Sequence, residues 1–278
     1  MSEGGQETRS ATGEVEVEAP VERVWRALTE ARELERWFPL EAEVEPGPDG
    51  RIWMGWGHEL GGWSRILAWA PPHHLRIAWV MGEGEDGGGG GGLDEAEEGS
   101  GGEVGARVTD YRLEDRPGDG HRTLLRVVTS GFPAGASWDD LVEGTRLGWA
   151  FELRQLKHYL ERHDGQDRTA AFLRRRVGLP RREAWDRLTA PGSGVETLAG
   201  SVFDRSPPWQ VALVCREPPD SLVRLTVDPA HDEPGARDVS VFISAWGEAG
   251  ALVPEVGELW RRRLGRLFPE GRELVKAP

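Results

Sequence analysis

The chain has 278 residues, of which 38% are hydrophobic and 29% charged, and its formal net charge at pH 7 is -14. This balance is typical of a globular protein, and no apolar stretch reaches the ~18 to 20 residues that a membrane-spanning helix needs. The polar, acidic start lacks the basic and apolar regions of a secretory signal, so we expect a cytoplasmic protein. The only cysteine, Cys215, can form neither an internal disulfide nor a cysteine-based metal cluster.

The acidic residues are concentrated in the first part of the chain. Residues 1–166 contain 17 basic and 32 acidic side chains, whereas residues 167–278 contain 17 and 16. A negative surface repels phosphate backbones, so we expect no nucleic-acid partner. The arginine runs 174–176 and 261–263 are local exceptions, which we interpret as surface partners of the acidic first domain rather than as a lipid or partner site.

The order of the predicted elements indicates an α+β fold. A strand is expected at Glu14–Ala19, because polar and apolar residues alternate there. Two short amphipathic helices follow, the first begun by Pro20 and the second covering Leu34–Phe38. Alternating runs between Gly and Pro turns then predict an antiparallel meander, and a long helix is expected at Trp138–His163. The predicted strands of the meander are Glu41–Val44, Arg51–Trp56, Trp63–Trp69, Leu75–Met81, Arg107–Leu113 and Thr123–Thr129.

A glycine-rich, acidic segment interrupts the meander at residues 82–105. It contains eight acidic residues and no basic one. Such a composition buries too little apolar surface to offset the cost of ordering, so the segment is predicted to be a disordered loop. An acidic flap over a ligand or a basic partner is the alternative.

The second part of the chain repeats the first in a shorter form. Four groups of residues recur in the same order, at offsets that fall from 160 to 111. The groups are Pro20, Trp25, Leu28 and Thr29 with Pro180, Trp185, Leu188 and Thr189; Pro71, Pro72 and Leu75 with Pro218, Pro219 and Leu222; Ser130 and Phe132 with Ser244 and Trp246; and Leu141, Val142, Trp149, Leu153 and Leu156 with Leu252, Val253, Trp260, Leu264 and Leu267. We therefore expect a disordered tail at 1–12, a first domain at 13–166 and a truncated second copy at 167–278.

These residues carry a family resemblance. The run Val24–Thr29, then Trp37–Phe38, the Pro71–Leu75 turn, the segment Thr123–Phe132 and the helix residues Gly148 and Trp149 resemble the START-like (SRPBCC) helix-grip superfamily. More narrowly, they are similar to bacterial proteins related to the C-terminal domain of the heat-shock chaperone ATPase activator. The resemblance implies two tandem helix-grip domains, each a curved antiparallel sheet packed on a long C-terminal helix, with an apolar cavity between them. The second copy lacks a counterpart of Trp37–Phe38, which leaves open whether it has a pocket.

Tryptophans dominate the candidate binding site. The chain has 13 of them, and successive predicted strands carry Trp53, Trp56, Trp63, Trp69 and Trp79, while the helix that would cover them carries Trp138 and Trp149. A buried indole needs a partner for its N–H, which a pocket with a polar ligand supplies. The ligand-lining interpretation therefore stands beside plain core packing. By strand parity we group Trp56 with Met54 and Ile52, Trp63 with Leu67 and Trp69, and Trp79 with Leu75 and Ile77.

Several polar or small residues complete the candidate site. Arg65 shares the parity of Trp63 and could anchor a carboxylate or phosphate inside the cavity, unless a bulge turns it outward. Tyr111 and Glu152 are further polar candidates, and Gly148 beside Trp149 leaves room either for a ligand or for a close approach of helix and sheet. The turn histidines His58, His73, His74 and His121 make a poor metal site, so no metal and no cofactor is expected.

Three functions are consistent with this sequence. The leading hypothesis is binding of a small hydrophobic or aromatic ligand in a Trp-lined cavity of the first domain, without catalysis, with a mainly structural second domain. A chaperone-ATPase accessory role is the alternative that the resemblance implies. A third hypothesis, a cyclase- or hydrolase-type enzyme, requires Arg65, Asp110, Tyr111 or Glu152 to converge inside the cavity.

Overall fold

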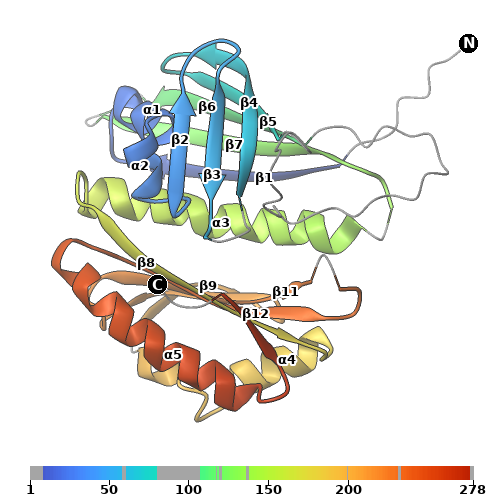
Figure 1. Cartoon of the computed structure of the whole chain (residues 1–278). Coiled ribbons are helices and arrows are strands. Elements are labelled where there is room, and N and C mark those ends of the chain that lie inside the picture. The colour runs from blue at the N-terminus through green and yellow to red at the C-terminus, as the bar shows by residue number, and fades with distance from the viewer. Residues whose placement is uncertain are drawn as a thin grey trace, which may run out of the picture. The chain divides into compact units, whose positions relative to one another are not determined.

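Figure 1 shows a computed structural model of the chain, in which the structure describes residues 9–57, 61–79, 107–116, 118, 121–135, 138–198, 200–230 and 233–275. These residues form two compact units, one ending at Gly165 and the other beginning at Gln166. Each unit consists of an antiparallel sheet and a helix that follows the last large strand. The predicted fold class, two tandem α+β domains of which the second is shorter, is confirmed. The predicted loop 82–105 lies outside the described residues.

The first unit is built on a seven-stranded sheet. Its strand order is β1-β7-β6-β5-β4-β3-β2, so all neighbours except β1 and β7 are consecutive in the chain. The elements are β1 (Arg9–Val17), α1 (Val21–Thr29), α2 (Ala31–Glu35), β2 (Glu41–Glu45), β3 (Arg51–Gly55), β4 (Gly61–Ala70), β5 (His74–Trp79), β6 (Val108–Arg116), β7 (Arg122–Phe132) and α3 (Asp139–Arg162).

The helices of the first unit all pack on one face of this sheet, which we call the inner face. Helix α1 contacts β6 and β7, α2 contacts β2, and α3 lies mainly on β1. Pro20 precedes α1, where its missing N–H costs nothing, and its carbonyl accepts the N–H of Val24 at 3.1 Å. The inward stripe of α1 is then Val21, Val24, Trp25 and Leu28, all buried.

Two predicted boundaries differ from the observed ones. Strand β1 begins at Arg9, so residues 9–12, which we assigned to the tail, pair with β7. The second helix ends at Glu35, and the chain continues through a turn in which Phe38 N–H still donates to Leu34. That turn places Trp37 and Phe38 at the inner face.

Helix α3 packs closely against the sheet at Gly13 of β1. A Cβ at this position would lie 2.9 Å from Leu153 Cδ1 and 3.1 Å from Trp149 Cβ. A larger side chain would therefore push α3 away from the sheet. The glycine that permits close packing thus lies in the strand.

The second unit is built on a six-stranded sheet with the order β13-β8-β12-β11-β10-β9. Helix α5 packs on β8 and β12, and α4 packs on β11 and β12. Its elements are β8 (Arg168–Val177), α4 (Arg181–Leu188), the 3-10 turn η2 (Val195–Leu198), β9 (Ser201–Ser206), β10 (Gln210–Cys215), β11 (Ser221–Pro229), β12 (Arg237–Trp246), the 3-10 turn η3 (Gly247–Leu252), α5 (Val253–Leu267) and β13 (Arg272–Val275). Cys215 is free and buried in this unit's core.

The strand order corrects one correspondence between the two copies. Strand β1 opens the first unit and pairs with β7, and β8 opens the second unit and pairs with β12. From these pairs across each sheet, β12, β11, β10 and β9 correspond to β7, β6, β5 and β4. The Pro71-Pro72 turn joins β4 to β5, so its counterpart is Pro207-Pro208 between β9 and β10, and the match to Pro218-Pro219 is wrong. The hydrogen bonds agree, because the N–H of Leu113 donates to His73 at 2.9 Å and that of Val227 to Trp209 at 2.8 Å.

This correspondence identifies what the second unit lacks. The offset between the copies falls from 160 at the first helix to 136 at the Pro-Pro turn, across the segment that forms α2, β2 and β3 in the first unit. The second unit has only η2 there, and β9 becomes the edge strand of the sheet. Among the described residues, no helix is long and apolar enough to span a membrane.

Candidate functional site

Aromatic rings gather between the sheet and α3 of the first unit. Phe38 is the centre of the group: its ring stacks on Trp37 at 5.0 Å and meets Trp56 at 5.4 Å and Trp149 at 5.6 Å, measured between centroids. Tyr111 of β6 packs edge-on against Trp149 at 5.8 Å. Of the predicted site residues, Trp56, Tyr111 and Trp149 are therefore brought together, and sequence reasoning did not include Phe38 among them.

Trp149 is held by a polar group of the sheet. Its indole N–H donates to Thr129 Oγ1 at 2.9 Å, and this hydroxyl lies 3.1 Å from that of Thr109 on β6. The indole N–H is thus satisfied by the protein, as core packing requires. Tyr111 is buried as well, and desolvation raises the pKa of its phenol, so it stays a neutral hydroxyl.

The first half of α3 is less covered than the second. Side chains from Leu153 to Leu160 that face the sheet are buried, whereas Leu141, Val142 and Thr145 are half-buried. A Cβ at Gly148 would meet no atom within 4 Å. Of the two interpretations of Gly148, a close helix–sheet approach is therefore excluded, and room for a ligand at this position stays a prediction.

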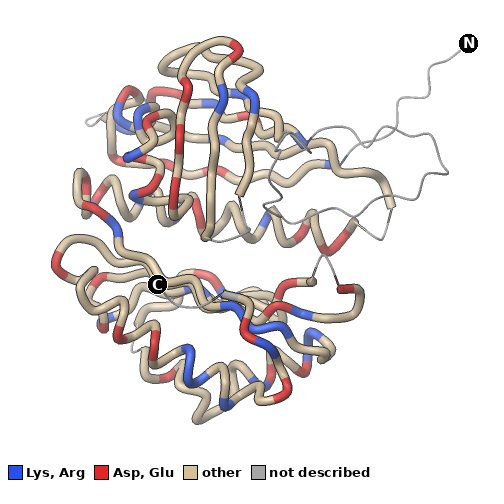
Figure 2. Tube along the Cα trace, in the orientation of Figure 1, with Lys and Arg blue, Asp and Glu red and all other residues tan. Residues whose placement is uncertain are grey.

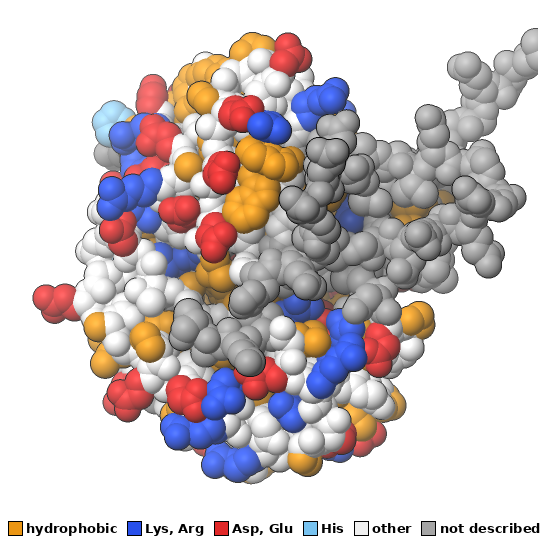
Figure 3. All heavy atoms as spheres, viewed as in Figure 1, with side chains coloured by type: hydrophobic (Ala, Val, Ile, Leu, Met, Phe, Trp, Pro, Cys, Tyr) orange, Lys and Arg blue, Asp and Glu red, His pale blue; other side chains and the backbone are white. Residues whose placement is uncertain are grey.

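Three predicted site residues lie on the outer face of the sheet, away from the helices. Trp53 and Trp63 are cross-strand partners there, and the guanidinium of Arg51 lies 4.1 Å above the Trp63 ring. Arg65 is exposed on the same face, next to the buried inner-face Ser64. Figure 3 shows apolar side chains between acidic ones over β3 and β4. The expectation that Arg65 enters the cavity is wrong.

A bulge in β4 separates two tryptophans that we grouped by parity. The register with β5 shifts between Ile66 and Ala68, so that Leu67 is the extra residue. Trp69 therefore faces inward, where its ring lies 5.1 Å from that of Trp25, while Trp63 and Leu67 face outward. An inserted residue reverses the alternation beyond it, which a regular two-residue period does not reveal.

The remaining predicted residues lie apart from the aromatic group or at its border. Trp79 pairs with Ser64, faces inward and is half-buried, with its ring over Gly62. Trp138 is the residue that precedes α3. Glu152 on α3 accepts a hydrogen bond from Gln155 at 3.1 Å. Trp79 thus shares the inner face with Trp56, whereas Glu152 lies on α3 and Trp138 directly before it.

The polar residues that an enzyme would need are not brought together. Asp110 lies on the outer face opposite Arg76, where it contacts His74 Nε2 at 3.0 Å and Arg112 Nε at 2.9 Å. Arg65 is also on the outer face, whereas Tyr111 is on the inner one. No acid-base pair is formed by these residues in the described part of the chain.

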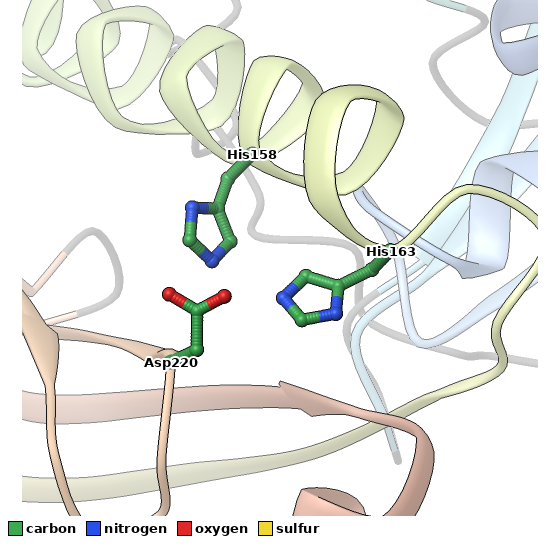
Figure 4. Close-up of side chains that lie close together, drawn as sticks. All are labelled: His158, His163 and Asp220. Atoms are coloured by element: carbon green, nitrogen blue, oxygen red, sulfur yellow. The ribbon is translucent and has the colours of Figure 1, made fainter.

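Two histidines that sequence reasoning did not single out lie near the end of α3. The imidazole centroids of His158 and His163 are 5.1 Å apart, and Figure 4 shows both side chains on the helix end. Asp220, also labelled there, belongs to the second unit, in the turn after β10. Two imidazoles are fewer than the three protein ligands of a catalytic zinc ion, so this pair does not make a metal site within the first unit.

The second unit contains a cavity of about 520 Å³. Ligand pockets have volumes of roughly 300 to 1,000 Å³, so this one is large enough for a small molecule. It is lined by Trp185, Thr189, Ala190, Pro191, Gly192, Val195, Glu196, Gly200, Val202, Arg205, Val211 and Leu213. The sequence had left open whether the second copy has a pocket, and the structure answers that it does.

The charged residues of the second unit are mostly paired. Asp238 binds both Arg174, at 2.6 Å, and Arg176, at 2.8 Å, and Glu258 binds Arg261 at 2.6 Å. Figure 2 shows the blue arginine positions along α5. These ion pairs lie within the second unit, so the expected pairing of the arginine runs with the acidic first domain stays a prediction.

Three comparisons place these features among known proteins. A family model described as "Activator of Hsp90 ATPase homolog 1-like protein" matches residues 18–161. Among solved structures, protein MLL2253 from Mesorhizobium loti is 22% identical, with 56% of this chain and 99% of that chain covered at a TM-score of 0.42. A search of curated proteins found no match.

Two further solved structures are similar to this chain. The Aha1 dimer from Colwellia psychrerythraea is 17% identical, with 56% of this chain and 99% of that chain covered at a TM-score of 0.42. The di-domain ARO/CYC BexL from the BE-7585A biosynthetic pathway is 14% identical, with 94% of each chain covered at a TM-score of 0.41.

Proposed function

This chain belongs to the family of Activator of Hsp90 ATPase homolog 1-like proteins, and from that premise we propose that its first unit binds a small hydrophobic or aromatic molecule without catalysing a reaction. The ligand would lie between the inner face of the sheet and the first half of α3. The observation that carries this proposal is the open space beside Gly148, next to an aromatic group that the rest of the helix holds in place.

The packing of α3 supports this location. Its second half is anchored, because Leu153, Leu156 and Leu160 are all buried. Its first half keeps apolar side chains half-buried, among them Leu141 and Val142, and an apolar molecule placed there removes this surface from water. The fixed half positions the site, and the uncovered half supplies the binding energy.

The aromatic residues at the border of this space supply the chemical preference. Trp56 and Trp79 are both half-buried on the inner face, with ring faces that the core does not fully cover. Stacked and edge-on contacts between rings add about 0.5 to 1.5 kcal/mol beyond the burial of area. Thr109 and Thr129 add hydroxyl groups, so an aromatic molecule with one polar group is the favoured ligand.

Filling the open space at Gly148 tests this proposal. Gly148→Leu should abolish binding of an aromatic probe such as 2-naphthol while leaving the fold intact, because no contact is lost. The matched control is Gly265→Leu in α5, where a Cβ also meets nothing within 4 Å and the helix gains the same propensity of about 1 kcal/mol. Isothermal titration and the shift in melting temperature on adding the probe are the measurements.

The outcomes separate clearly. The proposal predicts a probe-dependent rise in melting temperature for the unmodified protein and for Gly265→Leu, and none for Gly148→Leu. Equal binding to all three proteins would place the ligand elsewhere. No binding of any apolar or aromatic compound to the unmodified protein would refute the proposed function.

A chaperone-ATPase accessory role is the second candidate, since the family model is named for such an activator and matches most of the first unit. In this role the protein would be cytoplasmic, and a heat-shock chaperone would be its partner. The test is the ATP turnover rate of a purified bacterial Hsp90-type chaperone, measured with and without this protein. An unchanged rate, together with no co-purification of the two proteins, argues against this role.

A further inference from the structure

We propose that the cavity of the second unit is a separate binding site for a small carboxylate with an apolar or aromatic body. The cavity is open to solvent on one side and is bordered by the end of α4, the loop before η2 and the strands β9 and β10. None of its described lining residues belongs to α5, so it does not lie under the long helix. It is therefore a different kind of site from the one proposed in the first unit.

The cavity lies where the two units differ in sequence. After Thr29, the first unit continues into α2 and a turn that holds the fully buried Trp37. After the corresponding Thr189, the second unit has only small residues, from Ala190 to Gly194. A Cβ at Gly192 would meet nothing within 4 Å. The second unit thus has small residues where the first unit has α2 and Trp37.

The floor of the cavity is apolar. Trp185 of α4 and the inward residues Val211 and Leu213 of β10 are buried at its base. Val202 of β9 pairs with Leu213 and is 52% exposed at the border. These side chains suit a hydrocarbon chain or an aromatic ring.

Arg205 supplies a positive charge at the wall. It pairs with Val211 across β9 and β10, which puts both side chains on the cavity side of the sheet. In the part of the chain that the structure describes, Arg205 has no carboxylate partner, whereas the neighbouring Arg187 pairs with Glu183 and Glu270. A guanidinium in this position binds a carboxylate in a bidentate manner.

The acidic residue of the cavity is already engaged. The carboxylate of Glu196 accepts the N–H groups of Gly192 at 3.0 Å and Gly194 at 3.2 Å. Hydrogen bonds from its own backbone N–H and from these two glycines, together with the charge of Arg263, lower the pKa of Glu196. Glu196 therefore serves to order the loop, and Arg205 is the charged group that remains available to a ligand.

The test compares a carboxylate with its neutral analogue. We would titrate 4-phenylbutyrate and 4-phenylbutan-1-ol into the full chain by calorimetry, in a Gly148→Leu background that blocks the site proposed in the first unit. Arg205→Gln should raise the Kd of 4-phenylbutyrate by about tenfold or more, since hydrogen bonds to charged groups are the stronger ones, and change that of the alcohol by less than about twofold. Arg216→Gln, an exposed arginine outside the cavity, is the matched control and should change neither.

A second variant tests the location independently of charge. Val202→Trp extends a half-exposed side chain over the cavity and should weaken the binding of both compounds. Circular dichroism and the melting temperature check that this variant is folded. The proposal is overturned if Arg205→Gln and Arg216→Gln have the same effect on the Kd of 4-phenylbutyrate, or if Val202→Trp leaves the affinities for both compounds unchanged. Absence of binding of both compounds in the Gly148→Leu background also overturns it, and leaves the proposal for the first unit untouched.

Discussion

The two tyrosines of the chain both lie in the first unit, and each is placed so that ionisation is unfavourable. Desolvation raises the pKa of Tyr111, which is fully buried against Trp149. Desolvation also raises the pKa of Tyr159, helped by its hydrogen bond to Glu33 at 2.9 Å. Tyr159 joins Arg23 of α1 to the end of α3, so this hydroxyl has a structural role.

These raised pKa values predict a loss of stability at alkaline pH. Above the ordinary tyrosine pKa of about 10, the unfolded chain releases protons that the folded chain keeps, so the free energy of unfolding falls as the pH rises through the folded pKa values. Urea denaturation between pH 8 and pH 11, with tyrosinate absorbance followed in parallel, measures this. Tyr111→Phe should reduce the slope above pH 10, and a slope equal to that of the unmodified protein would contradict the assignment.

At the scale of elements, the turn after α2 belongs to the segment of the first unit, α2 to β3, that the second unit does not repeat. Trp37 is 0% exposed, and its indole N–H donates to the carbonyl of Ala27 at 2.8 Å. The amide of Gln155 on α3 in turn donates to the carbonyl of Trp37. One residue thus connects α1, α2 and α3.

Removing this side chain should therefore be costly. We expect Trp37→Ala to lower the free energy of unfolding by about 3 to 5 kcal/mol, the usual cost of deleting a large buried aromatic side chain. The matched variant Trp63→Ala removes the same side chain from the half-buried outer face and should cost clearly less. Chemical denaturation of both variants gives the comparison, and equal losses would mean that Trp37 does not hold the helices together.

At the scale of the whole molecule, the described residues form two compact units, and buried hydrophobic residues lie in each. The hydrophobic core of the second unit extends from Leu173 on β8 to Trp260 and Leu264 on α5, and it contains only residues of that unit. Each core can therefore respond separately to a substitution.

This organisation predicts two resolvable unfolding transitions. Trp37→Ala should lower the melting temperature of one transition, and Trp260→Ala, which removes a buried tryptophan from the second core, should lower that of the other. Differential scanning calorimetry of the full chain is the measurement. If both substitutions shift a single common transition, the two units unfold as one.

The sequence by itself was sufficient for the architecture, because hydrophobic periodicity and turn residues act locally. The helix Asp139–Arg162, the meander and the shortened repeat were all readable from spacing. Parity also placed Trp79 with Ile77 on the inner face. The helix and the strands depend on residues close together in the chain, whereas the repeat is found by comparing segments 111 to 160 residues apart.

The faces of other residues and the location of open space were decided by the tertiary structure. The bulge at Leu67 in β4 reversed the alternation, so Trp63 and Arg65 face away from Trp69. The cavity beside Trp185 is bordered by β9, which is an edge strand in the second unit, and it is formed only once α4, the following loop and the sheet have packed. Local patterns determine which elements form, whereas the distances between elements determine where a ligand fits.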